Sequence, residues 1–123
     1  MLKTQKNDFC TLNFYDSYMI AVVNKGIHLA PAENQVLIDA ANAFYRDKPF
    51  VYITHRKHSY SVDPIIFVKT AKMKNLLGVA VVADVPVSKG NAEIEKLFYN
   101  KPYEIFSVLD EAVEWAKQLI QNG

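Results

Sequence analysis

Two short apolar runs constrain the fold of this chain more than any other feature: Val51–Thr54 and Leu77–Val82. Polar residues do not alternate with apolar ones in either run, which is typical of a buried strand. Segments of helical periodicity separate the strands. Strands joined by a helical crossover lie parallel to one another in a sheet. The sequence therefore predicts an α/β fold.

The N-terminal part of the chain predicts an antiparallel hairpin. Phe9–Tyr15 and Tyr18–Val23 are β-prone runs, and only a polar pair separates them. A two-residue polar break between such runs is typical of a hairpin turn. The segment before them, Met1–Asp8, is polar and lacks the hydrophobic centre of a signal peptide, so we expect no export signal.

Helical periodicity and capping residues predict four helices. We expect the first helix from Pro31 to about Arg46 and the second from Pro64 to about Lys74. The third should begin at Asn91, after a loop over Pro86–Gly90. The fourth should follow a last strand, Tyr103–Phe106, with Ser107 as its cap. Asp110 and Glu111 suit the positive end of the last helix. The residues expected to face the core are Val36, Leu37, Ala40, Ala41 and Phe44 in the first helix, Ile65, Val68 and Ala71 in the second, Ile94, Leu97 and Phe98 in the third, and Leu109, Ala112, Val113, Ala116 and Ile120 in the fourth, with Trp115 at its margin.

Length and composition predict one globular domain. The chain has 123 residues, of which 50% are hydrophobic and 22% are charged. We expect a mixed sheet of five strands with four helices, the core spanning about residues 9–119. The net charge of +1 argues against nucleic acid or an anionic membrane as the main partner. No apolar run approaches the ~20 residues of a membrane span.

Cysteine and glycine usage exclude several classes of site. The single cysteine, Cys10, cannot form an internal disulfide, so we expect a reducing, cytoplasmic environment and a buried thiol. The glycine-rich phosphate-binding motifs are absent, and no cofactor is expected. A metal site is not expected either, because His55 and His58 lack a cysteine nearby and His28 is distant in the sequence.

A polar loop, His55–Asp63, joins the first buried strand to the helix that begins at Pro64. Ligands and partners of parallel α/β sheets usually meet the fold at the carboxyl ends of the strands. One hypothesis is an anion-binding corner formed with the helix N-terminus, and the alternative is an ordinary solvated loop. The candidates for anion binding are His55, Arg56, Lys57 and His58.

The serines of this loop allow three hypotheses. A phosphate on Ser61 would lie near the helix amides, with Arg56 and Lys57 close in sequence. The simpler and favoured hypothesis is that Ser61 or Asp63 only caps the helix. Catalysis by Ser59 or Ser61 with His58 and Asp63 is the least favoured, because the Gly-x-Ser-x-Gly elbow is absent.

The order of elements and several short sequence segments resemble the SpoIIAA-like fold of anti-sigma-factor antagonist (STAS) domains and, more distantly, of lipid-carrying CRAL-TRIO domains. The resemblance covers about Phe9 to Leu119. The segments that carry the resemblance are Lys48–Ile53 with the turn Ser59–Pro64, then Leu77–Val82, and finally Tyr103–Ser107, which is followed by Asp110–Ala112 and Trp115.

The resemblance implies a serine at the start of the second helix that is phosphorylated by an anti-sigma-type kinase, which docks on the same surface. Ser59 and Ser61, with Tyr60 and Asp63, are the matching candidates. The family usually has Asp-Ser-Ser or Asp-Ser-Thr followed by Gly, and this chain does not. It is more similar to the uncharacterised bacterial branch of the family, for which no activity is implied.

Two functions are therefore predicted as alternatives. The first is a non-enzymatic STAS-like regulatory module that presents the Ser59–Asp63 turn and the following helix to a protein partner. The second is a small-molecule, anion or lipid-binding domain that uses the 55–63 loop and the N-terminus of the second helix. The resemblance also implies helices on only one face of the sheet, so we expect a homodimer to protect the other face and the hairpin edge.

Overall fold

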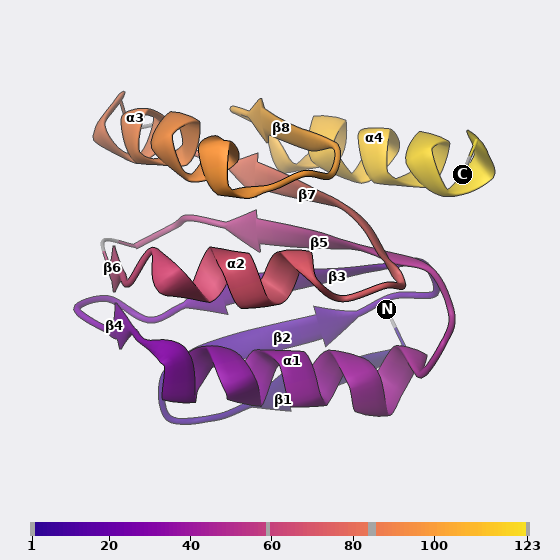
Figure 1. Ribbon diagram of the computed structural model, residues 1–123, viewed down its shortest axis with the longest axis horizontal. Helices are drawn as coiled ribbons and strands as arrows, with labels where there is room; N and C mark the ends of the chain where they lie inside the picture. The colour runs from indigo at the N-terminus through magenta and orange to yellow at the C-terminus, as the bar shows by residue number, and fades with distance from the viewer. Residues whose placement is uncertain (1, 59, 84–85, 123) are drawn as a thin grey trace.

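The computed structural model of the chain describes residues 2–58, 60–83 and 86–122, with residues 86–89 described through their backbone alone. Within this part of the chain, six strands form one mixed sheet in the order β1-β2-β3-β5-β7-β8, and helices pack on both of its faces (Figure 1). A separate pair of two-residue strands, β4 and β6, lies beside the sheet. The predicted α/β class is confirmed.

The elements follow one another as the alternating pattern predicts. The strands are β1 (Lys3–Lys6), β2 (Cys10–Phe14), β3 (Tyr18–Val23), β4 (His28–Leu29), β5 (Phe50–His55), β6 (Ser61–Val62), β7 (Leu76–Val82) and β8 (Tyr103–Phe106), and the helices are α1 (Pro31–Tyr45), α2 (Ile65–Ala71), α3 (Pro86–Glu95), the 3-10 turn η1 (Lys96–Phe98) and α4 (Leu109–Asn122).

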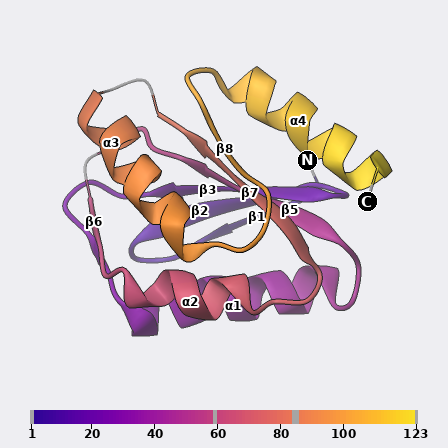
Figure 2. The same cartoon turned by 45° about the horizontal axis from the view of Figure 1, so that its top comes forward.

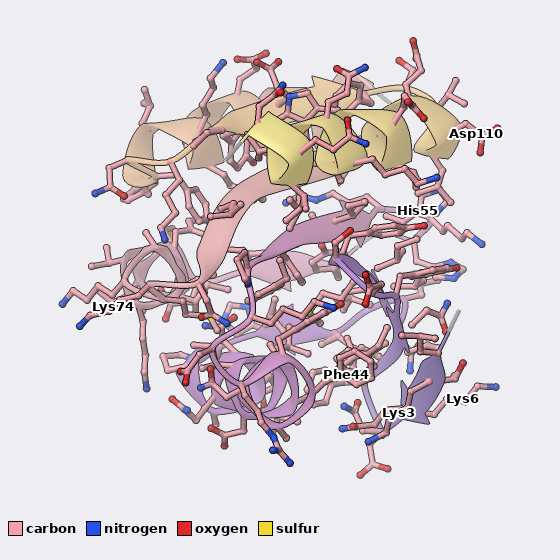
Figure 3. All side chains as sticks on the ribbon, turned by 90° about the vertical axis from the view of Figure 1, so that its right-hand side faces the viewer. Lys3, Lys6, Phe44, His55, Lys74 and Asp110 are labelled. Carbon is pink, nitrogen blue, oxygen red and sulfur yellow. The ribbon has the colours of Figure 1, made fainter. Side chains whose placement is uncertain are left out.

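The hairpin and the parallel strands are confirmed. β2 and β3 pair antiparallel, whereas β3, β5, β7 and β8 are parallel neighbours. The main sheet contains one strand more than the five that the sequence predicts, because β1 pairs with β2 along its outer edge. An edge strand needs no buried face, so its polar sequence carries no apolar pattern to reveal it. Lys3 and Lys6 project from this edge (Figure 3), which discourages pairing with another chain.

The sheet has a hydrophobic core on each face. On one face Leu12, Phe14 and Met19 pack beneath α1 and α2. On the other face Ile53 and Ala80 pack beneath α4. Figure 2 shows α1 and α2 below the sheet and α4 above it. The prediction that helices cover one face only is therefore wrong, so no uncovered sheet face remains for a homodimer to protect.

The buried face of α2 differs from the predicted one. Ile66, Phe67 and Thr70 are buried, whereas Ile65 and Val68 are exposed. The helix begins with four consecutive apolar residues, so no polar position marks its solvent side. In α1, Leu37, Ala40 and Ala41 are buried as predicted and Phe44 packs on the ring of Phe14, but Val36 is exposed.

The third helix begins earlier than the sequence predicts. α3 starts at Pro86, so the expected loop over 86–90 is helical and Asn91 is not its cap. Proline is compatible with the first turn of a helix. Ile94, Leu97 and Phe98 were expected in the core but are exposed, and Ala92 and Glu95 face inward instead.

Candidate binding groove between α2 and α3

A groove opens beside the carboxyl ends of β5 and β7, where the loop after β5 meets α2 and α3. Its volume is about 370 Å3. This falls within the range of about 300–1,000 Å3 that is typical of small-molecule sites. Phe67 on α2 makes tilted ring contacts with Phe98, the last residue of η1, and with the following Tyr99, at centroid separations of 5.8 and 5.7 Å. The residues that line the groove are Arg56, His58, Tyr60, Ser61, Val62, Pro64, Phe67, Asn91, Ile94, Glu95 and Phe98.

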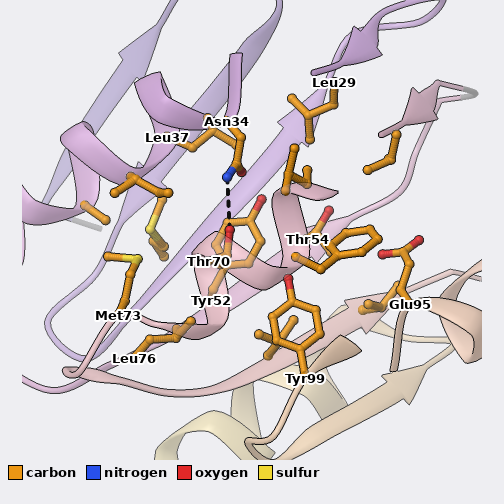
Figure 4. A pocket seen from close by; sticks show the side chains of 18 of the residues that line it. Leu29, Asn34, Leu37, Tyr52, Thr54, Thr70, Met73, Leu76, Glu95 and Tyr99 are labelled. Carbon is orange, nitrogen blue, oxygen red and sulfur yellow. Dashed lines mark hydrogen bonds between the residues drawn. The ribbon is translucent and has the colours of Figure 1, made fainter. Parts of the chain in front are cut away.

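A smaller cavity of about 40 Å3 lies behind the groove, between the sheet and helices α1 and α2. Figure 4 shows Leu37, Met73 and Leu76 around it, together with the buried hydrogen bond from Asn34 to Thr70, 3.0 Å long. Benzene needs a cavity of about 150 Å3, so this space admits water-sized groups rather than a whole ligand. The residues shared by the groove and the cavity are Arg56, Tyr60, Val62, Phe67 and Glu95.

An ion pair between Arg56 and Glu95 lies where the groove and the cavity meet. Their side chains are only 8% and 10% exposed. The guanidinium also lies 5.8 Å from the centre of the Tyr60 ring. Burial by itself would lower the pKa of Arg56, but the hydrogen bond to Glu95 and the charge interactions with Tyr60, Glu95 and Tyr103 together outweigh it and raise the pKa above its usual value. The guanidinium of Arg56 therefore remains charged inside the protein.

Several polar atoms near the pair are unusual for a protein interior. Arg56 Nε and Tyr103 Oη are buried and have no hydrogen-bond partner among the described residues. Burial raises the pKa values of Tyr52, Tyr99 and Tyr103, so their hydroxyl groups stay protonated. The inner cavity is therefore largely apolar, with the buried hydroxyl groups of Tyr52 and Tyr99 and the guanidinium of Arg56 among its lining residues.

Comparisons with known proteins concern the fold. No protein-family model and no curated protein matches the sequence. The structure is similar to the crystal structure of an uncharacterized DUF3478-family protein with a SpoIIAA-like fold from Shewanella loihica PV-4. The TM-score is 0.60 at 12% identity, and the alignment covers 91% of this chain and 98% of that chain. This chain has a SpoIIAA-like fold. The resemblance seen in the sequence is thereby confirmed at the level of the fold.

The SpoIIAA-like fold does not gather the four anion-binding candidates at the start of α2. His55 ends β5, and Lys57 and His58 are exposed, His58 within the groove. Arg56 turns inward to Glu95, and its amide N–H donates to the carbonyl of Val82. Helix α2 has only seven residues. Nothing in the sequence singles out Glu95, because its partner Arg56 lies 39 residues away along the chain.

The serine turn is at the surface, and its contacts differ in part from those expected. Ser59 lies outside the described residues. Ser61 belongs to β6, and its hydroxyl lies 2.7 Å from Nδ1 of His28. Asp63 accepts a hydrogen bond from the amide of Ile65 at 3.1 Å in the turn that leads into α2, whose N-cap position is Pro64. Tyr60 turns inward, and its hydroxyl lies 3.2 Å from that of Thr54.

The histidine beside Ser61 is therefore His28 rather than His58, and the sequence could not show this. The two residues are joined by the pairing of β4 with β6, and strands of two residues carry no readable pattern. Among the residues that the structure describes, no three His, Cys, Asp or Glu side chains form a possible metal site. Across the same residues, the helices are all too short or too polar to cross a bilayer.

Apolar side chains stand exposed on the elements beside the groove. Ile65 and Val68 on α2 are exposed, as are Ile94 and Phe98, and Leu97 is 84% exposed. Ile65 and Val68 lie three residues apart and so share one face of α2. Ile94 and Phe98 also line the groove itself. Exposed apolar side chains on these neighbouring elements make them a candidate interaction surface.

Proposed function

We propose that this chain is a non-enzymatic, STAS-like regulatory module that presents the Ser59–Asp63 turn and helix α2 to a protein partner. The observation that supports this most is the cluster of exposed apolar side chains on α2, α3 and η1. Full burial of one such side chain is worth about 1.5–3 kcal/mol. A partner that covers Ile65, Leu97 and Phe98 would bury these side chains and so stabilise the complex, whereas the isolated chain leaves them in water.

The charge around this surface suits an acidic partner. No Asp or Glu occurs between Pro64 and Ala83, whereas Lys69, Lys72 and Lys74 follow the apolar start of α2. Complementary charge speeds association and favours the correct partner. A kinase of the anti-sigma type is the partner class that the resemblance implies, and its acidic residues would face these lysines.

Ser61 is the phosphorylation site that we propose within the described residues. Its side chain is exposed, and the only hydrogen bond recorded for its hydroxyl among these residues joins it to His28. A phosphate at Ser61 would lie beside the His28 ring and a protonated imidazole would pair with it. Incubation with ATP and an extract of the source organism should add a single phosphate to the wild-type chain. A S61A variant that gains the same mass would contradict the assignment.

Photo-crosslinking in the source organism tests the docking surface. We would place a photoreactive phenylalanine analogue at Leu97 and, as a control, at Gln118, which is exposed on α4. A discrete protein adduct should form from Leu97 and disappear when Ile65 is changed to Asp. Equal adducts from both positions, or none from Leu97, would reject α2 and α3 as the docking surface.

A second function is supported by a different observation, the five lining residues that the groove shares with the inner cavity. An amphipathic small molecule could lie along the groove with one end at the cavity, between Phe67 and Ile94. Calorimetric titration with straight-chain alcohols of six to ten carbons tests this proposal. Affinity should rise with each added methylene, by roughly 0.8 kcal/mol. Binding that is absent, or that does not depend on chain length, would reject it.

A further inference from the structure

We infer that Arg56 makes the groove selective for ligands with an uncharged hydrogen-bond acceptor, such as a ketone, amide or ester oxygen. This inference rests on the second function proposed above, the binding of an amphipathic small molecule. Arg56 lines both the groove and the inner cavity, so its guanidinium lies where the polar end of a bound molecule would come to rest.

The guanidinium is only partly used by the protein. One terminal nitrogen donates to Glu95. Nε is buried and unpaired among the described residues, although the side chain as a whole is only 8% exposed. A buried donor without a partner is costly, and a ligand oxygen that accepts from Nε would remove that cost. Arg56 therefore has a buried donor without a partner among the described residues, in a side chain that lines the site.

The charge of the pair sets the class of ligand. Glu95 already neutralises Arg56, and both side chains are nearly excluded from water. A carboxylate brought beside them would be repelled by Glu95, and an ammonium group would be repelled by Arg56, in surroundings that screen charge weakly. An uncharged acceptor can use Nε without either penalty. The apolar remainder of the molecule would lie against Phe67, Phe98 and Ile94.

Three probes with the same chain length separate these possibilities: 2-decanone, decanoate and decylamine, titrated into the intact chain at neutral pH. Isothermal calorimetry gives the affinities, and amide chemical shifts locate the site, with Trp115 on the opposite face as the reference. We expect 2-decanone to bind at least about tenfold more tightly than either charged probe, which is the ratio for one hydrogen bond to a charged group.

The variant Arg56→Lys tests whether Arg56 is the cause. Lysine keeps a positive charge that can pair with Glu95 but has no donor at the position of Nε. It should lose about tenfold in affinity for 2-decanone and little for the other probes. The control is Lys57→Gln, which changes the exposed neighbouring residue and should leave all three affinities unchanged.

Each outcome is decisive. Equal binding of the three probes, or an Arg56→Lys variant that still prefers 2-decanone, would overturn the assignment to Arg56 while leaving a ligand-binding function in place. Binding of none of the probes would overturn both the inference and the second function. If Arg56→Lys disturbs the fold, the near-UV circular dichroism will show it, and the comparison of the three probes with the unchanged chain still tests the selectivity.

Discussion

Removal of Glu95 should be among the most destabilising single changes to this chain. The Arg56–Glu95 pair is 8% and 10% exposed, so Glu95→Ala leaves a guanidinium charge inside the protein without a counter-ion. Breaking a buried pair on one side costs about 3–5 kcal/mol, which is a large share of the ~5–15 kcal/mol stability of a typical domain. Urea unfolding followed by the fluorescence of the single tryptophan, Trp115, measures this loss.

An exposed ion pair in the same chain provides the matched control. Lys48 and Asp16 form an ion pair whose side chains are 51% and 79% exposed, and Asp16→Ala should cost no more than about 1 kcal/mol. The double variant Arg56→Met with Glu95→Met should be far less damaging than Glu95→Ala, because no charge remains buried. If Glu95→Ala costs no more than Asp16→Ala, the pair is not desolvated as described and the charge argument for ligand selectivity also fails.

Three further predictions concern packing, pH and capping. Gly78→Ala would place a methyl group 2.6 Å from Leu119 Cδ2 and 3.0 Å from the Pro102 carbonyl oxygen, so we expect a loss of about 1–3 kcal/mol in urea unfolding. In helix α3 the methyl group added by Gly90→Ala would meet nothing within 4 Å, so we expect a gain in stability of about 0.5–1 kcal/mol. A loss of stability at Gly90 would contradict this contrast with Gly78. Stability should fall as the pH rises above ~10, because unfolded tyrosines ionise there while folded ones resist; each such group contributes up to about 1.4 kcal/mol per pH unit. A flat pH profile would contradict the raised pKa values of Tyr45, Tyr52, Tyr99 and Tyr103. Asp63→Ala should cost about 0.5–2 kcal/mol in urea unfolding through loss of its hydrogen bond to the Ile65 amide at the start of α2, whereas Ser61→Ala should cost less. The reverse order would contradict this geometry.

The architecture was largely readable from local patterns. Unbroken apolar runs identified β5 and β7, and a two-residue break identified the hairpin of β2 and β3. These features depend on residues a few positions apart, so the chain displays them without any tertiary contact. The polar strand β1 was not predicted, because an edge strand can pair with its neighbour without burying apolar side chains and so shows no apolar pattern.

The orientation of short helices was not readable. α2 opens with four adjacent apolar residues, and periodicity cannot select one face when all candidates are apolar. The packing of Phe67 against Phe98 and Tyr99 makes that choice, and it turns Ile65 outward. The exposed apolar cluster, which carries the proposed function, is thus a result of tertiary packing.

Neighbouring residues in the loop after β5 look alike in the sequence and differ in the folded chain. Arg56 and Lys57 are adjacent cations, yet one is buried and the other is exposed, because Glu95 arrives from α3 to neutralise Arg56. Ser61 likewise meets His28 only because β4 pairs with β6. Hydrophobic pattern specifies strands and helices over short distances along the chain. The charges and hydrogen bonds of a site depend on residues that meet only after those elements have packed.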